Sequence, residues 1–167
     1  MRHHLNKARE LYASKGLAQT AKSALRYVPI EVNNLQFRLC HGNGARVMDE
    51  DWDNLLILDG CRYDMFAERS DSPGALEYRI SLGSSSEEFM EQNFVGRQFH
   101  DTVYVSANPF IPKLGLNEGT FHAVVDLLDD WDEESQTIRP DSVSEAAHRA
   151  HSWYPDKRLV VHFMQPH

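Results

Sequence analysis

Three polar side chains stand at points of the sequence where parallel-sheet proteins place their chemistry: Asp59, Ser86 and His167. Asp59 directly follows the apolar run Leu55–Leu58, and His167 follows the expected last strand. In open α/β sheets, ligands bind beyond the carboxyl ends of the strands. Ser86 stands at the start of an expected helix, where free N–H groups and the helix dipole favour an anionic ester and a developing alkoxide. The three positions predict one rim at which an ester could be bound and attacked.

Each of these features also has a structural interpretation. An aspartate at the end of a strand can cap the helix that follows it. Ser85-x-x-Glu88 has the form of a capping box, in which Ser85 accepts a hydrogen bond from the first helical turn. Both interpretations hold together if Ser85 caps the helix while Ser86 faces the site. Strand alternation places His162 inside the last strand, which indicates a hydrogen-bonded histidine of the sheet rather than a ligand.

The elements that must position these residues alternate between strand and helix. The run Leu55–Leu58 is uncharged and unbroken, which predicts an interior strand buried on both faces. Further strands are expected at 76–80, 102–105 and 158–164, and helices at 63–69, at 87–94 and from 140 to just before Pro155. This alternation predicts an α/β fold with a mostly parallel central sheet. An edge beside the 158–164 strand is expected to remain exposed.

Composition limits the class of protein further. The chain has 167 residues, of which 41% are hydrophobic, as in a globular domain with an ordinary core. No apolar run approaches the roughly 20 residues that span a bilayer, and the N-terminus lacks the apolar stretch of a signal peptide, so a cytoplasmic protein is expected. The net charge of −8 argues against a general nucleic-acid binder. Cys40 and Cys61 have no metal-binding spacing and are expected to be reduced thiols.

A basic helical segment, residues 1–47, is expected to precede a second part at 48–167. Residues 1–26 contain six Lys or Arg and one acidic residue, whereas residues 27–167 contain 11 Lys or Arg and 24 Asp or Glu. Apolar residues recur at helical spacing within residues 1–28, which predicts two short amphipathic helices. Such helices would suit peripheral contact with an anionic membrane or an acidic partner, and the alternative is that they pack against the acidic body.

Four segments, taken together, resemble the sulfatase-like branch of the alkaline phosphatase superfamily, and its archaeal and other prokaryotic members in particular. They are residues 51–64 (DWDNLLILDGCRYD), the serine cluster at 81–89, residues 105–109 (VSANP) and residues 162–167 (HFMQPH). The resemblance runs from about residue 48 to the end. It implies an α/β/α sandwich with a divalent metal at the carboxyl edge of the sheet. It also implies hydrolysis or transfer of a sulfate or phosphate ester through a covalent intermediate.

The resemblance further implies roles for individual residues. Asp59 matches the first metal-binding aspartate, and Ser86 occupies the position of the nucleophile, which also contacts the metal. His167 matches a histidine that faces the ester or its leaving group, and Asn108 would donate to a non-bridging ester oxygen. The cation would be Mg²⁺, Mn²⁺, Ca²⁺ or Zn²⁺. The substrate would be a small-molecule or glycan ester of sulfate or phosphate.

Two departures from the family pattern qualify this expectation. The Cys/Ser-x-Pro-x-Arg signature is absent around Ser86, which argues against conversion to formylglycine and against sulfatase activity proper. No Asp-His metal motif follows His167, so the chain is expected to be cut short, to bind metal weakly or not at all, and to be nearly inert as it stands. A phosphatase of the haloacid dehalogenase type would need an aspartate where Cys61 stands. A non-catalytic binding or remnant protein with a partial hydrolase fold is the other alternative.

Overall fold

The computed structural model describes residues 44–117 and 119–165, together with six isolated residues between 29 and 39. The chain divides into two compact units, Met1–Gly44 and Ala45–His167. The amphipathic helices predicted within residues 1–28 lie outside the described residues, as do Cys40 and His167. In the described part of the chain, no helix is both long enough and apolar enough to cross a membrane.

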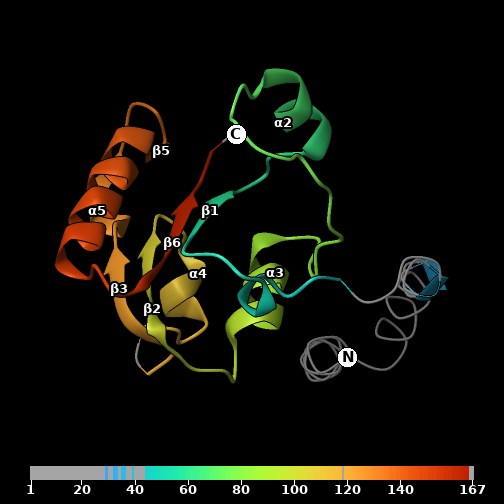
Figure 1. Cartoon of the computed structure of the whole chain (residues 1–167), viewed down its shortest axis with the longest axis horizontal. Helices are drawn as coiled ribbons and strands as arrows, with labels where there is room; N and C mark the ends of the chain where they lie inside the picture. The colour runs from blue at the N-terminus through green and yellow to red at the C-terminus, as the bar shows by residue number, and fades with distance from the viewer. Residues whose placement is uncertain are drawn as a thin grey trace, which may run out of the picture. The chain divides into compact units, whose positions relative to one another are not determined.

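The second unit is built on a four-stranded parallel sheet (Figure 1). In chain order its strands are β1 (Asn54–Leu58), β2 (Phe99–Ser106), β3 (Phe121–Asp126) and β6 (Arg158–Phe163). They lie in the order β1-β6-β2-β3, and each pairs in parallel with its neighbour. The predicted fold class, α/β with a mostly parallel central sheet, is therefore confirmed.

Helices connect these strands. They are the 3-10 turns η1 (Val47–Asp49) and η2 (Leu128–Asp130) and the helices α2 (Tyr63–Arg69), α3 (Ser86–Phe94), α4 (Phe110–Lys113) and α5 (Pro140–Trp153). A two-stranded antiparallel hairpin, β4 (Trp131–Asp132) with β5 (Thr137–Ile138), precedes α5. Pro140 suits the first turn of α5, where its missing N–H has no intrahelical partner to lose. The helices predicted at 63–69, at 87–94 and from 140 are thus confirmed.

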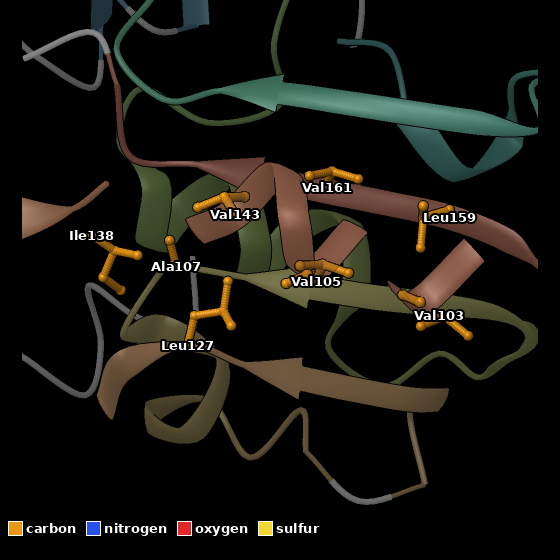
Figure 2. Close-up of a cluster of buried hydrophobic side chains, with 10 residues drawn as sticks. Val103, Val105, Ala107, Leu127, Ile138, Val143, Leu159 and Val161 are labelled. Atoms are coloured by element: carbon orange, nitrogen blue, oxygen red, sulfur yellow. The ribbon is translucent and has the colours of Figure 1, made fainter. Parts of the chain in front are cut away.

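Hydrophobic clusters cover both faces of the sheet. On one face, α5 packs through Val143 and Ala146 against alternate residues of β2 and β6, such as Val105 and Val161 (Figure 2). On the other face, α3 and α4 pack against the intervening residues of the same strands. The buried members of that second cluster are Met48, Met90, Phe94, Phe99, Tyr104, Ile111, Leu116, Phe121 and Val160. The two central strands, β6 and β2, therefore have helices on both sides.

β1 is an edge strand of the described sheet, so the prediction that Leu55–Leu58 lies in its interior is wrong. Leu55 and Ile57 pack against the cluster of α3, but Leu56 is 61% exposed and Leu58 is 38% exposed. Leu56 pairs with Val161 on the face that α5 covers, and α5 packs over β2 and β6. An apolar run indicates a strand but does not say which place in the sheet that strand takes.

Two other strand predictions need correction. β6 lies between β1 and β2, so the strand predicted at 158–164 has neighbours on both sides and does not lie at an exposed edge. The strand predicted at 76–80 is absent, and the chain there has no regular structure, with Leu76 and Tyr78 exposed. Among the described residues no strand pairs with this segment, although the Tyr78 ring makes an edge-to-face contact with Tyr63 of α2. β3 was not expected from the sequence.

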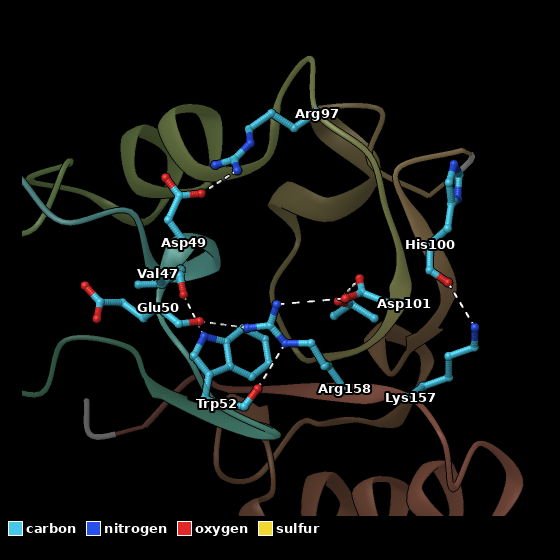
Figure 3. Close-up of polar contacts among 10 residues, drawn as sticks. Val47, Asp49, Glu50, Trp52, Arg97, His100, Asp101, Lys157 and Arg158 are labelled. Carbon is cyan, nitrogen blue, oxygen red and sulfur yellow. Dashed lines mark hydrogen bonds and ion pairs between the residues drawn. The ribbon is translucent and has the colours of Figure 1, made fainter.

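Arg158 ties together the amino ends of β1, β6 and β2 (Figure 3). Its Nε donates to the Trp52 carbonyl and its Nη2 to the Glu50 carbonyl, each at 3.0 Å. Its Nη1 lies 3.9 Å from the Asp101 carboxylate, and its guanidinium carbon lies 3.7 Å from the centre of the Trp52 ring. The Trp52 indole N–H in turn donates to the Val47 carbonyl at 2.6 Å. Two guanidinium nitrogens of Arg158 therefore donate to backbone carbonyls, and the third faces the Asp101 carboxylate in an ion pair.

Candidate functional site

Asp59 is held at the opposite, carboxyl end of β1. Its N–H donates to the Phe163 carbonyl at 3.1 Å, so pairing with β6 extends to this residue. Gly60 follows with φ of 74°, a left-handed conformation that glycine adopts without strain and that turns the chain away from the sheet. The Asp59 side chain is 14% exposed. Backbone pairing and the glycine turn together fix a largely buried carboxylate at the end of the sheet.

Ser86, the first residue of α3, meets this carboxylate. Its Oγ lies 2.7 Å from Asp59 Oδ2 and 2.9 Å from Oδ1, so its single hydroxyl proton can be donated to either oxygen. The serine side chain is only partly buried. The hydroxyl of a partly buried serine at a helix N-terminus thus contacts a carboxylate at a strand end, 27 residues away in the sequence.

The N-terminus of α3 is capped by Ser85, which leaves the hydroxyl of the next residue, Ser86, to face Asp59. Ser85 Oγ accepts from the Glu88 N–H at 3.3 Å, and the Glu88 carboxylate accepts from the N–H and the hydroxyl of Ser84, each at 3.0 Å. Ser85 as the cap is therefore confirmed. Gly83 allows the loop to approach α3, because a Cβ there would lie 2.3 Å from the backbone nitrogen of Phe89.

Asn108 reaches the same carboxylate from the loop after β2. Its Nδ2 donates to Asp59 Oδ2 at 3.0 Å, while its Oδ1 accepts from the Phe110 N–H at 2.9 Å. The second bond determines which end of the amide faces Asp59. Asn108 is 1% exposed, and its own N–H donates to Ser106 Oγ at 3.0 Å. Three distant segments therefore converge on one carboxylate, although the roles expected for these residues remain predictions.

A buried histidine and tyrosine also belong to this cluster, and the sequence interpretation did not assign them to it. His162 of β6 is 1% exposed, and its Nε2 lies 3.5 Å from Asp59 Oδ2. Its Nδ1 lies 2.8 Å from the Tyr104 hydroxyl oxygen. The expectation that His162 is a hydrogen-bonded histidine of the sheet is thus confirmed. Its approach to Asp59 follows from the register of β1 with β6, which pairs it with Ile57.

Tyr104 keeps its proton over the whole physiological range. Complete burial raises the pKa of this phenol far above its ordinary value, and the nearby Asp59 charge raises it further. The hydroxyl is therefore available as a hydrogen-bond donor. His167, the histidine expected at the rim, lies outside the described residues, and its role stays a prediction.

The donors at Asp59 supply part of a site for a divalent cation. The carboxylate and the Ser86 hydroxyl are hard oxygen ligands that already lie within 2.9 Å of each other. Within residues 44–117 and 119–165, no three His, Cys, Asp or Glu side chains come together as a metal-binding group. Because these ions take at least four ligands, the others would come from the ester, from water or from residues beyond those ranges. Asp59 and Ser86 fit as two of the ligands.

A separate polar hollow lies against α5. It is lined by Asp129, Asp130, Trp131, Asp132, Ser142, Glu145 and Arg149. The Asp132 carboxylate accepts from the N–H groups of Ser135 and Glu134, at 3.2 and 2.8 Å, and these bonds lower its pKa. Its charge is used to close the turn between β4 and β5, so this hollow has a structural explanation.

Comparison of the chain with models of protein families, with curated proteins and with solved structures found no match in any of the three. Function must therefore be inferred from the chemistry of the Asp59 cluster itself.

Proposed function

We propose that the Asp59 cluster is the nucleophile side of an active site of the sulfatase-like alkaline phosphatase type, built on an α/β/α sandwich. It would hydrolyse or transfer a sulfate or phosphate ester with the help of a divalent cation. One observation carries the proposal: Ser86 Oγ lies 2.7 and 2.9 Å from the two carboxylate oxygens of Asp59. A nucleophile and a carboxylate that share one cation need to be this close.

In the proposed reaction Ser86 attacks the phosphorus or sulfur of the ester. A bond forms from Oγ, the bond to the leaving alkoxide breaks, and the hydroxyl proton leaves Ser86, with the Asp59 carboxylate beside it as an acceptor. Water then hydrolyses the seryl ester, or an acceptor hydroxyl takes over the transferred group, and either step restores Ser86. A bound cation would lower the pKa of the hydroxyl and neutralise charge on the transferred group.

Electrostatics favours the inclusion of a cation. The free N–H groups at the start of α3 attract anions, but the Asp59 carboxylate already lies at this point and would repel an anionic ester. A divalent ion bound to Asp59 would reverse the local charge. Asn108, with an amide that the Phe110 N–H orients, would hold the carboxylate in place and could share its second N–H with the ester.

The competing function is that of a non-catalytic binding protein with a partial hydrolase fold. One observation favours it: Asp59 accepts hydrogen bonds from both Ser86 and Asn108, two groups of the chain itself. Such a carboxylate could simply tie β1, α3 and the loop after β2 together.

Covalent labelling separates these two functions. The purified chain is incubated with Mn²⁺ and an aryl phosphate or aryl sulfate, quenched, and analysed by intact mass and peptide mapping. Single-turnover labelling is chosen because an incomplete metal site would turn over slowly. We expect a phosphoryl or sulfuryl group on Ser86 that depends on Mn²⁺ and is retained in Ser85→Ala. Because an incomplete site would bind the ion weakly, Mn²⁺ is supplied in large excess. Loss of the label in Ser86→Ala and Asp59→Asn supports the proposal, whereas a wild-type protein that binds no Mn²⁺ and takes no label even in that excess refutes it.

A further inference from the structure

The imidazole of His162 presents a buried nitrogen to the Asp59 carboxylate. Among the described residues, Nε2 has no hydrogen-bond partner at normal distance, and Asp59 Oδ2 lies 3.5 Å away. The ring is 1% exposed, so bulk water cannot serve as the hydrogen-bond partner of Nε2. A buried polar nitrogen in this position is costly unless it is paired, and hydrogen bonds in ligand-free sites often shorten when the site is filled.

The other nitrogen of the ring decides which atom carries the proton. The Tyr104 hydroxyl lies 2.8 Å from Nδ1. Burial raises the pKa of Tyr104, so the phenol keeps its proton and has a hydrogen to donate to the Nδ1 lone pair when Nδ1 carries none. A neutral imidazole that accepts at Nδ1 carries its hydrogen on Nε2. The opposite tautomer would aim the Nε2 lone pair at a carboxylate oxygen, which is repulsive, so Asp59 favours the Nε2–H form and the Tyr104 hydroxyl complements it as a donor to Nδ1.

We propose that Tyr104 and His162 are positioning residues for Asp59: the Tyr104 hydroxyl fixes His162 as the Nε2–H tautomer, and this N–H holds Asp59 Oδ2 in the orientation that meets Ser86. The Asn108 amide approaches the same oxygen at 3.0 Å, so two donors, one from β6 and one from the loop after β2, anchor it. Neither Tyr104 nor His162 is exposed to a substrate, and both act through Asp59. The catalytic consequence rests on the proposed function, while the hydrogen-bond chain itself does not.

The tautomer of His162 can be measured directly in the wild-type chain. The nine histidines are labelled with ¹⁵N, and two-bond ¹H–¹⁵N correlation spectra distinguish the two neutral tautomers. The His162 signals are identified by their absence in His162→Gln. We expect Nε2 to be protonated and Nδ1 to be an acceptor. In Tyr104→Phe, which keeps the ring and removes only the donor, this preference should weaken to a mixture. A protonated Nδ1 in the wild type, or an unchanged spectrum in Tyr104→Phe, would overturn the proposal.

Two substitutions at His162 test the positioning role. His162→Gln keeps an N–H donor at a similar distance from the backbone, whereas His162→Leu removes it and keeps the volume. If the N–H positions Asp59, Mn²⁺ affinity should fall about 10-fold or more in His162→Leu and remain within about threefold of wild type in His162→Gln. Equal losses in both variants would show a packing role only and reject the inference. If the wild type binds no Mn²⁺, the proposed function fails, and the tautomer still decides whether the chain of hydrogen bonds exists.

Discussion

The two ends of the sheet hold polar clusters of very different character. At the amino end, Arg158 donates hydrogen bonds to two backbone carbonyls, stacks on Trp52 and forms a longer ion pair, at 3.9 Å, with the partly exposed Asp101 carboxylate. At the carboxyl end, Asp59 gathers Ser86, Asn108 and His162, yet the buried Nε2 of His162 lies 3.5 Å from the Asp59 carboxylate that it faces. In the first cluster the hydrogen bonds of the arginine go to backbone carbonyls. In the second, several polar side chains converge around a buried imidazole that is incompletely paired.

Burial sharpens this difference. The Arg158 and Asp101 side chains are 25% and 63% exposed, so their ion pair is screened by water and contributes little. Asp59 and His162 are 14% and 1% exposed, where a charged or unpaired group is costly. Polar groups that are held in a buried place at such a cost are a common property of functional sites. We therefore propose a structural role for the amino end and a chemical role for the carboxyl end.

The largest expected effect is on Mn²⁺-dependent labelling, which should depend on the carboxyl end of the sheet and not on the amino end. Ser86→Ala should reduce the Mn²⁺-dependent labelling of the protein by at least about 100-fold, because the attacking atom is removed. Arg158→Met, at the other end of the same strands, should leave the labelling of the folded protein unchanged. Labelling rates are compared after circular dichroism has shown that both variants are folded. Equal losses in the two variants would remove the distinction.

The free energy of unfolding should instead depend on the amino end of the sheet. Arg158→Met loses two hydrogen bonds to carbonyls and the stack on Trp52, which should lower the free energy of unfolding by about 2–3 kcal/mol. The matched control is Arg149→Met on α5, where the arginine forms an exposed ion pair with Glu145 at 3.8 Å. That change should cost less than about 0.5 kcal/mol. Urea denaturation measures both, and similar values for the two would contradict a structural role for Arg158.

Alkaline pH should act on the carboxyl end through Tyr104. The folded-state pKa of this phenol is raised, whereas an unfolded chain releases the proton near pH 10. Above about pH 10 the unfolded state therefore binds fewer protons than the native state, and stability falls by up to about 1.4 kcal/mol per pH unit. Below that pH the contribution is constant. Urea denaturation between about pH 9 and about pH 11 should show a shallower decline for Tyr104→Phe, and identical slopes would refute the burial argument.

The smallest expected effect concerns the cap of α3. Ser85→Ala removes the acceptor of the Glu88 N–H and should lower the free energy of unfolding by about 1 kcal/mol. Labelling of Ser86 should be retained, since the hydroxyl that meets the carboxylate belongs to Ser86 and not to its neighbour. Ser152→Ala, at an exposed serine within α5, is the matched control and should change stability by less than about 0.5 kcal/mol. A Ser85→Ala variant with no loss of stability would show that the cap is dispensable.

Local patterns in the sequence located much of the site. The end of an apolar run marked Asp59, and the capping box identified Ser85 as the cap and so left Ser86 to face the site. These signals depend on a few consecutive residues, because strand ends and helix caps are set by local backbone chemistry. Asn108 was indicated by the family resemblance rather than by any physical pattern.

Features that depend on strand order were not predictable in this way. The edge position of β1 and the interior position of β6 follow from long-range pairing, which hydrophobic patterns do not encode. The contact of Tyr104 with His162 likewise requires the register of β2 with β6, which pairs Tyr104 with Val160. Alternation along β6 could predict that His162 is buried, but not which groups its two nitrogens meet.

Anomalous diffraction from crystals grown with Mn²⁺ and orthovanadate tests the central claim most directly. The wavelength is set at the manganese edge, so that the ion is located independently of the protein phases. We expect an ion bound to the Asp59 carboxylate and to Ser86 Oγ, with vanadate on the same side of Ser86. Manganese found only in the acidic hollow beside α5, with Asp59 and Ser86 still bonded to each other, would contradict it.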